Sequence, residues 1–292
     1  MRAVNNEEEL RKILKQQQNY LPLSSTIYGI ICNELDYGVC GHLKSTIYVP
    51  DPILDGGRSS SLVVVYAAYD DVPNEGWVPL AIFWDSDAEK DSDIADLLLT
   101  IPDIDWNLPI SVLPAPLTII EKLKSILECG QFFGMKRDLA YLMDGQVYGL
   151  QAAQKVSIPD GYKLRALHPR DLKYIKSKTG PTHEQDRDVC TQLTVLPSAA
   201  LYTDDNQGSE VLVSWATVRF NGEIGRIFTV PEYRGRGLAK VVTATLANHM
   251  LESREAVYVS IDASNAASIK FNTAIGFQNK YTAGIATIVP SS

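Results

Sequence analysis

The stretch that most constrains this chain is GEIGRIFTVPEYRGRGLAKVV, residues 222–242. An apolar run at 224–230 leads through Gly235 and Gly237 into a pattern with apolar residues four apart, which indicates a strand followed by a helix. The first amides of a helix lack intrahelical partners and lie at the positive end of its dipole, so such a turn can bind a phosphate. Glycines leave those amides accessible, although a tight strand-to-helix connection would also use them.

Three phosphate-binding patterns can be compared with this turn. The dinucleotide pattern G-x-G-x-x-G fails because Lys240 stands where the third glycine belongs, and the Walker pattern G-x-x-x-x-G-K-[ST] does not occur. The pattern R/Q-x-x-G-x-G/A fits, with Arg234, Gly237 and Ala239 in its defining positions. Downstream, NAASIKFNTAIGF at 265–277 fits N-x-x-A/S-x-x-x-Y-x-x-x-G-F at every defining position except the tyrosine.

Together these motifs resemble those of the GNAT superfamily of acyl-CoA N-acyltransferases. The segment 222–242 is further similar to the glycine N-acyltransferases and their relatives, in which a G-E-x-G strand leads into P-x-Y-R-G-x-G-L. The resemblance covers the C-terminal half well and the N-terminal half weakly. It implies an α/β fold with a mixed sheet, of the GNAT type, in the C-terminal half. It also implies acyl-CoA or acetyl-CoA as co-substrate, a small amine as acceptor, and no metal.

The resemblance assigns roles to particular residues. Glu223 corresponds to the catalytic glutamate, which removes a proton because an ammonium has no lone pair with which to attack. The alternative is a solvated, idle Glu223 at the start of a strand. Backbone amides near 228–230 would stabilise the charge that develops on the acyl oxygen. The residues expected to contact acyl-CoA are Phe228, Thr229, Val230, Arg234, Gly235, Arg236, Gly237, Leu238, Ala239, Lys240, Asn265 and Ser268.

The second motif departs from the family at Asn272, where many GNAT enzymes carry a tyrosine thought to protonate the leaving thiolate. Asparagine is no acid at neutral pH, although its amide could donate a hydrogen bond to the sulfur. Asn265 is expected to cap its helix and to contact the pantetheine arm. His183, in the loop-like TGPTHEQD, is a candidate acceptor contact.

Strand alternation predicts which residues of this segment share a face. Glu223, Gly225, Ile227 and Thr229 would lie on one face, with Ile224, Phe228 and Val230 on the other. The residues FNGE at 220–223, with Asn221-Gly222 at the centre, predict a type I′ hairpin before this strand.

The length of 292 residues permits two domains, and QKVSIPDG at 154–161 marks a boundary between 1–155 and 156–292. The first half is expected to be a degenerate copy of the fold that lacks the phosphate-binding loop. Its predicted elements are a helix starting near Asn5 or Asn6, strands at 25–32, 44–51, 61–70 and 78–84, helices at 91–101 and 116–127, and a strand at 139–151.

The second half has a cleaner order of elements. We expect strands at 162–167, 199–205, 211–220, 222–230 and 256–262, helices at 168–177, 184–196, 235–250 and 265–275, and a closing pair of strands at 277–284 and 285–290. This order predicts a mixed sheet with helices on both faces.

The net charge of −8 argues against nucleic-acid and anionic-membrane partners, because those require a basic surface. No apolar run approaches the roughly 20 residues that span a bilayer. The acidic, amphipathic start favours neither a secretory signal nor a transit peptide, and the four cysteines lack CxxC spacing. We therefore expect a cytoplasmic protein, with a mitochondrial location still compatible, and neither a disulfide framework nor a zinc site.

The leading hypothesis is transfer of an acyl group from acyl-CoA to the amine of glycine or another amino acid, by direct attack. An N-acetyltransferase acting on a peptide, protein or arylalkylamine is the second hypothesis, and the acidic surface would suit a basic tail. A non-catalytic CoA-binding module is the third, because of Asn272. The sequence leaves acceptor identity, acyl-chain length and oligomeric state open.

Overall fold

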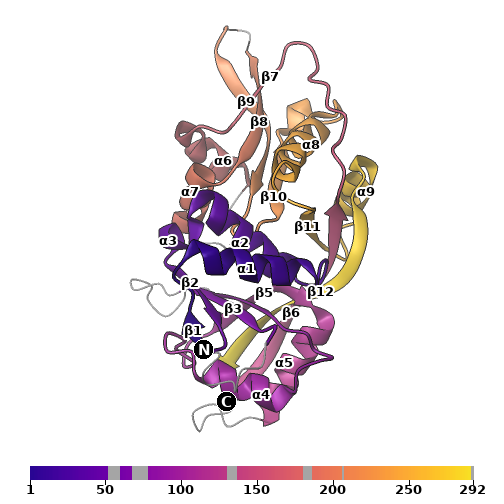
Figure 1. The fold of residues 1–292 in the computed structure, drawn as a ribbon. Helices are drawn as coiled ribbons and strands as arrows, with labels where there is room; N and C mark the ends of the chain where they lie inside the picture. The colour runs from indigo at the N-terminus through magenta and orange to yellow at the C-terminus, as the bar shows by residue number, and fades with distance from the viewer. Residues whose placement is uncertain (52–59, 68–77, 130–136, 180–185, 206, 291–292) are drawn as a thin grey trace. The chain divides into compact units, whose positions relative to one another are not determined.

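The computed structural model describes residues 1–51, 60–67, 78–129, 137–179, 186–205 and 207–290. The chain divides into two compact units, one formed by residues 1–146 and 281–292 and the other by residues 147–280 (Figure 1). The expected domains, 1–155 and 156–292, stay a prediction about parts that fold independently. Among the described residues, no helix is long and apolar enough to cross a bilayer.

The first unit is a mixed sheet with helices. Its strands are β1 (Arg2–Ala3), β2 (Ser45–Val49), β3 (Val63–Ala67), β4 (Val78–Phe83) and β5 (Ile110–Pro116). Successive strands pair antiparallel except β4 and β5, which are parallel. The helices are α1 (Glu7–Gln18), α2 (Ser25–Tyr37), α3 (Val39–Leu43), α4 (Asp91–Leu99) and α5 (Leu117–Cys129). The sequence had not indicated β1, α3 or β5.

The first helix is capped as its sequence predicts. The Asn6 side chain accepts a hydrogen bond from the N–H of Glu9 at 2.8 Å, so Asn6 and not Asn5 is the cap. Glu7 and Glu8 also lie in the first turn, where the helix dipole favours negative charge.

The strand expected at 25–32 is wrong, because these residues belong to helix α2. Its first nine residues, 25–33, are all buried. A helix buried on every side has no polar face, so its sequence lacks the period that separates a helix from a buried strand. The helix ends at Gly38, which has φ of 61° and supplies the left-handed residue common at helix ends.

The second unit contains an antiparallel sheet in the order β10-β9-β8-β7. These strands are β7 (Lys163–Arg165), β8 (Ser198–Asp204), β9 (Glu210–Val218) and β10 (Ile224–Thr229). The short 3-10 helices are η1 (Pro169–Asp171) and η2 (Pro231–Tyr233), and the α-helices are α6 (Leu172–Thr179), α7 (Asp186–Val195), α8 (Leu238–Leu251) and α9 (Ala266–Ile275). Strand β11 (Val257–Asp262) lies between α8 and α9 in the chain. Helix α8 packs beside β10 and β11 in Figure 1.

Two long strands contribute residues to both units. Strand β6 (Arg137–Leu150) neighbours β11, and β12 (Gln278–Pro290) pairs antiparallel with β5 through residues 283–288. The closing pair expected at 277–284 and 285–290 is therefore wrong, because both segments form one strand. Its register shifts between Gly284 and Ala286, where the sequence had suggested a turn.

The chain order of the elements repeats. Apart from α3 and the 3-10 helices, both β1 to β6 and β7 to β12 follow the order β-α-α-β-β-β-α-β-α-β.

Each of the two compact units has an apolar core of its own. One apolar cluster lies in the first unit, around Trp84, Leu98 and Leu123, and another in the second, around Trp215, Tyr202 and Leu193.

Candidate active site

Strand β10 carries a β-bulge at its centre. Gly225 pairs with Thr217 and Phe228 with Trp215, so two residues, 226 and 227, face a single residue of β9. Arg226 has φ of 48°, an uncommon conformation for a residue with a side chain that costs about 1–2 kcal/mol. Such strain is often found at functional sites.

The bulge overturns the alternation expected from the sequence. Because one extra residue is inserted, the register places Phe228 on the same face as Gly225, and Thr229 on the face of Ile224. Phe228 stacks on Trp215 with ring centroids 4.8 Å apart, within the apolar cluster of α6 and α7. The prediction that Thr229 shares a face with Glu223 is therefore wrong.

The hairpin before β10 is present, but its turn is not type I′. The N–H of Gly222 donates to the Arg219 carbonyl at 2.9 Å, and the N–H of Arg219 donates to the Glu223 carbonyl at 2.8 Å. Gly222 has φ of 76°, whereas Asn221 is not at positive φ, which type I′ requires. This is the three-residue loop that closes with a left-handed glycine.

Glu223 is buried, with 2% of its surface exposed. The Ser260 hydroxyl on β11 donates to its Oε1 at 2.5 Å. The residue is therefore not the solvated side chain that was the alternative to catalysis. A buried carboxylate held by a hydrogen bond from a neighbouring strand is suited to accepting a proton.

The backbone of β10 limits which amides can serve as an oxyanion hole. The N–H of Val230 donates to the Val213 carbonyl at 2.9 Å. Because hydrogen-bonded pairs alternate along an antiparallel ladder, the N–H of Phe228 also points to β9, whereas that of Thr229 points away from it. Of the three expected amides, Thr229 is the one that the ladder turns outward.

The glycine turn has the backbone geometry of an anion site. Gly235 and Gly237 have φ of 78° and 75°, and a Cβ added at either position would meet nothing within 4 Å. Gly237 is the N-cap of α8, a helix of 14 residues that begins at Leu238. The amides of the turn are therefore accessible, and the helix dipole adds positive potential.

The arginines of the turn make hydrogen bonds through their guanidinium groups. Arg234 Nε donates to the Thr229 carbonyl at 3.1 Å, and its guanidinium lies 5.7 Å from the Phe228 ring centroid. Arg236 donates to the Tyr162 hydroxyl at 3.1 Å and to the Glu232 carbonyl at 3.2 Å.

The remaining residues of the turn differ in exposure. Lys240 is exposed, Ala239 is half-buried and Leu238 is buried in the core. Lys240 therefore adds accessible positive charge to that of Arg234 and Arg236, whereas Leu238 can contact a ligand only through its backbone.

Helix α9 begins as the sequence predicts, since the Asn265 side chain accepts from the Ser268 N–H at 3.0 Å. Asn272 is 1% exposed, and its Nδ2 donates to the Ser268 carbonyl at 2.9 Å. Its amide donates within its own helix in this arrangement. A hydrogen bond from Asn272 to a leaving sulfur stays a prediction, and it requires this amide to turn.

Several other expectations concern histidines and metals. His183 lies outside the described residues. His249, near the end of α8, lies 3.4 Å from Glu252 through its Nδ1. Within the described parts of the chain, no group of three or more His, Cys, Asp or Glu side chains could hold a metal ion.

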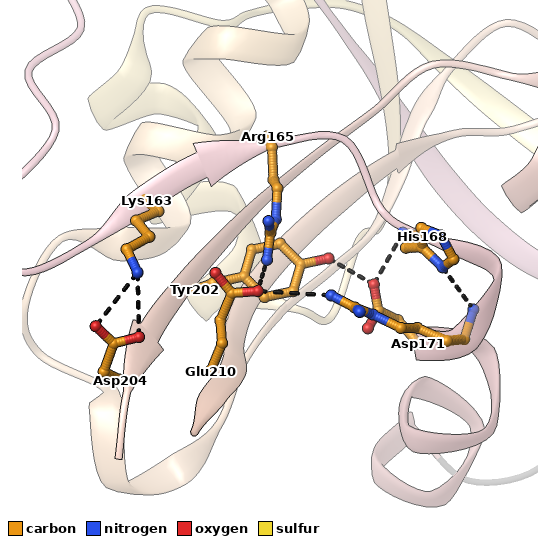
Figure 2. A network of polar contacts seen from close by, with 8 residues as sticks. Lys163, Arg165, His168, Asp171, Tyr202, Asp204 and Glu210 are labelled. Carbon is orange, nitrogen blue, oxygen red and sulfur yellow. Dashed lines mark hydrogen bonds and ion pairs between the residues drawn. The ribbon is translucent and has the colours of Figure 1, made fainter. Parts of the chain in front are cut away.

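A second polar cluster, which sequence reasoning missed, fixes strand β7 at the edge of the sheet (Figure 2). The Arg165 guanidinium lies 4.1 Å from the Tyr202 ring centroid and pairs with Glu210, which also lies 3.5 Å from Arg170. At the other end, Lys163 pairs with Asp204 at 3.1 Å.

The centre of this cluster is Tyr202, a buried residue of β8. Its hydroxyl donates to Asp171 at 2.5 Å, and the same carboxylate accepts from the His168 N–H at 2.8 Å. Burial, with the Asp171 carboxylate beside it, raises the pKa of Tyr202 well above its usual value. These contacts link η1 to β8, so the cluster holds these two elements together. Its signal in the sequence was only the alternation of Lys163 and Arg165 in β7.

The chain resembles known proteins over part of its sequence and in its fold as a whole. A family model described as FR47-like protein matches residues 205–284. No curated protein matches. Among solved structures, a Drosophila protein superposes with a TM-score of 0.75 at 14% identity, covering 100% of this chain and 99% of its own. A tandem GNAT protein from the clavulanic acid biosynthesis pathway has a TM-score of 0.58 at 13% identity, covering 99% and 98%.

A further neighbour, a candidate acetyltransferase from Pyrococcus horikoshii, has a TM-score of 0.55 at 9% identity and covers 98% of this chain and 87% of its own. These likenesses confirm the fold: the chain is a mixed α/β protein of the GNAT fold, and the first half belongs to that architecture too. The match to the FR47-like model lies within the second half.

Proposed function

We propose that this chain, with its GNAT fold, transfers an acyl group from acyl-CoA to the amine of a small acceptor such as glycine or another amino acid. One observation carries the proposal. The bulged strand β10, with the buried carboxylate of Glu223 at its start, leads directly into the glycine turn that opens α8.

The turn fits the pyrophosphate of acyl-CoA. Its two positive-φ glycines expose backbone amides, and the exposed cations Arg234, Arg236 and Lys240 add charge in an otherwise acidic protein. Asn265 and Ser268 at the start of α9 would contact the pantetheine arm.

The chemistry then requires a base and an oxyanion donor. Glu223 removes a proton from the attacking amine, and the outward N–H of Thr229 donates to the acyl oxygen as negative charge develops there. The nitrogen attacks the thioester directly, and the CoA thiolate leaves from the tetrahedral intermediate.

The acceptor is the finer part of the proposal. The likeness of 222–242 to the glycine N-acyltransferases supports a small amino acid. The net charge of −8 favours instead an N-acetyltransferase acting on a basic peptide, and an arylalkylamine is a third possible amine. Asn272 stands where many GNAT enzymes carry an acid, and its amide donates to the Ser268 carbonyl of its own helix. This favours a non-catalytic CoA-binding module.

An acceptor panel tests the proposal. CoA thiol release from acetyl-CoA and from a longer acyl-CoA would be measured with glycine, other amino acids, a basic peptide and an arylalkylamine. We expect turnover with an amino acid. Turnover with the peptide alone would overturn the amino-acid acceptor, and CoA binding without turnover on any amine would establish the module.

The role of Glu223 is tested in the same assay. Glu223→Gln should lower kcat/KM by about 10²–10⁴-fold, the usual contribution of a general base, with CoA affinity unchanged. Glu121→Gln, at an exposed position of α5, is the matched control and should have wild-type activity. A loss below about threefold in Glu223→Gln would exclude it as the base.

A further inference from the structure

The proposed base does not itself lie open to an acceptor. Glu223 is 2% exposed, so an amine in water has little access to its carboxylate. A general base acts on a proton within hydrogen-bond reach or through one intermediate group. The question is which group lies between the carboxylate and the acceptor.

Ser260 has the position that such a group requires. It lies on β11, and of residues 257–261 it is the one that keeps partial exposure, whereas its neighbours Val259 and Ile261 are 2% and 4% exposed. Its hydroxyl donates to Glu223 Oε1 at 2.5 Å, within the range of O–H···O⁻ bonds to an ionised acceptor. One end of the pair is therefore buried and the other is partly accessible.

The two strands that carry this pair terminate different sheets. Strand β10 is the last strand of the sheet β10-β9-β8-β7, and β11 is the last strand of the other sheet, next to β6. The Glu223–Ser260 hydrogen bond links these strands near the start of β10. Further along β10 lie the bulge and the outward N–H of Thr229, where the thioester is proposed to react.

We propose that Ser260 is a catalytic residue that relays the proton from the attacking amine to Glu223. The inference rests on the proposed function, in which Glu223 is the base. A hydroxyl can donate one hydrogen bond and accept another at the same time, as a relay requires.

The step balances without any further reactant. The N–H bond of the acceptor breaks, its proton passes to Ser260 Oγ, and the original Ser260 proton passes to Glu223 Oε1. The electron pair freed from the acceptor ammonium stays on nitrogen and attacks the acyl carbon, while the π pair of the carbonyl moves to the acyl oxygen. When this tetrahedral intermediate collapses, the C–S bond breaks and its electron pair leaves with the CoA thiolate. Ser260 ends unchanged and Glu223 ends protonated.

A purely structural role for Ser260 makes different predictions. A buried carboxylate needs a hydrogen-bond partner, so Ser260→Ala would lower stability under either role. Only the relay requires that proton transfer itself slow down. The decisive readouts are therefore the rate of the chemical step and the number of protons that move in it.

The experiment compares wild type, Ser260→Ala, Ser260→Thr, Glu223→Gln and the Glu223→Gln/Ser260→Ala double variant. Thiol release from acetyl-CoA is followed in single turnovers with the fastest amine of the acceptor panel, and CoA affinity and melting temperature are measured in parallel. Ser177→Ala removes an exposed hydroxyl of α6 and is the control expected to react like wild type.

The relay predicts that Ser260→Ala lowers the single-turnover rate by about 10²-fold with CoA affinity retained. Ser260→Thr, which keeps the hydroxyl, should recover the rate to within about tenfold of wild type. The double variant should be no slower than the slower single variant, since both residues serve one proton transfer. In mixtures of H2O and D2O, the wild-type rate should depend on deuterium content along a curve, because two protons move together.

The outcomes separate the relay from the function on which it rests. A Ser260→Ala rate within about threefold of wild type, or a linear deuterium dependence, overturns the relay while Glu223→Gln still identifies the base. A Ser260→Ala enzyme that melts at a lower temperature but reacts at the wild-type rate also overturns the relay, because Ser260 then has only a structural role. Absence of turnover by the wild type on every amine of the panel overturns the proposed function and the relay with it.

Discussion

At the scale of single residues, the glycine turn depends on two backbone conformations that other residues adopt at a cost. Gly237 has φ of 75° at the N-cap of α8. Gly237→Ala should destabilise the fold by about 1–2 kcal/mol and weaken CoA binding, because the turn must shift the amides that would face the pyrophosphate. Calorimetric titration with CoA and urea unfolding measure the two effects.

A second glycine supplies the control for this prediction. Gly41 lies inside α3 without a positive φ, and a Cβ there meets nothing within 4 Å. Gly41→Ala should leave CoA affinity unchanged and raise stability by up to about 1 kcal/mol, the helix-propensity difference. Unchanged CoA affinity in Gly237→Ala would remove the turn from the binding site.

Tyr258 makes the unfolding free energy of the protein fall at high pH. Burial, and secondarily the nearby Glu255, raises the pKa of Tyr258 to about 12. Above its ordinary pKa near 10 the unfolded chain releases this proton while the folded chain keeps it. Stability is therefore complete below about pH 10 and falls by about 1.4 kcal/mol per pH unit as the pH rises towards 12.

Tyr258→Phe removes this titrating group. Between pH 10 and 12, the slope of the unfolding free energy against pH should become shallower than in wild type, by about 1.4 kcal/mol per pH unit. Urea unfolding at a series of pH values gives the slope. Equal slopes in the two proteins would contradict the assignment.

At the scale of elements, the edge of the second sheet depends on the Tyr202–Asp171 contact (Figure 2). Tyr202→Phe leaves a carboxylate without this donor and should cost about 1–3 kcal/mol. Combined with Asp171→Asn, the changes should be non-additive by about 0.5–3 kcal/mol, since the two groups share one hydrogen bond. Tyr174→Phe, at a residue that is 37% exposed, is the control and should change stability by no more than about 0.5 kcal/mol.

Most elements were predictable where a local period or cap specified them. The residues 265–275 and 7–18 read as helices because a capping asparagine and an apolar stripe coincide, and both caps are present. Helix α2 was not predictable, because burial on all sides removes the period. The bulge of β10 was not either, since the extra residue depends on pairing with β9, which lies outside the local sequence.

The candidate site divides in the same way. The conformation of the glycine turn was predictable, because Gly235 and Gly237 adopt the positive φ that glycine reaches most easily. Ser260 was not, because nothing in VYVSID distinguishes a serine that touches Glu223 from any other strand serine. The Glu223–Ser260 contact joins residues 37 positions apart, so only the fold reveals it.

At the scale of the whole molecule, the two halves repeat one order of elements. The last strand of each repeat, β6 or β12, nevertheless contributes residues to both compact units. The final strand of the chain, β12, supplies residues 281–290 to the first unit, where it pairs with β5. Strand β6, which closes the first repeat, supplies residues 147–150 to the second unit and neighbours β11 in its sheet. Sequence periodicity reports which residues form a strand, not which strand it pairs with, so this exchange could not be predicted.

The exchange makes the stability of the first unit depend on the end of the chain. Ile288 is 1% exposed and packs in the apolar cluster of the first unit, with its register partner Ile110 on β5. Ile288→Ala should cost about 2–5 kcal/mol by leaving a cavity in that cluster. Hydrogen exchange should accelerate first in β4 and β5, although the substitution lies in the C-terminal strand. If protection were lost first in β8 and β9 instead, β12 would belong energetically to the second unit.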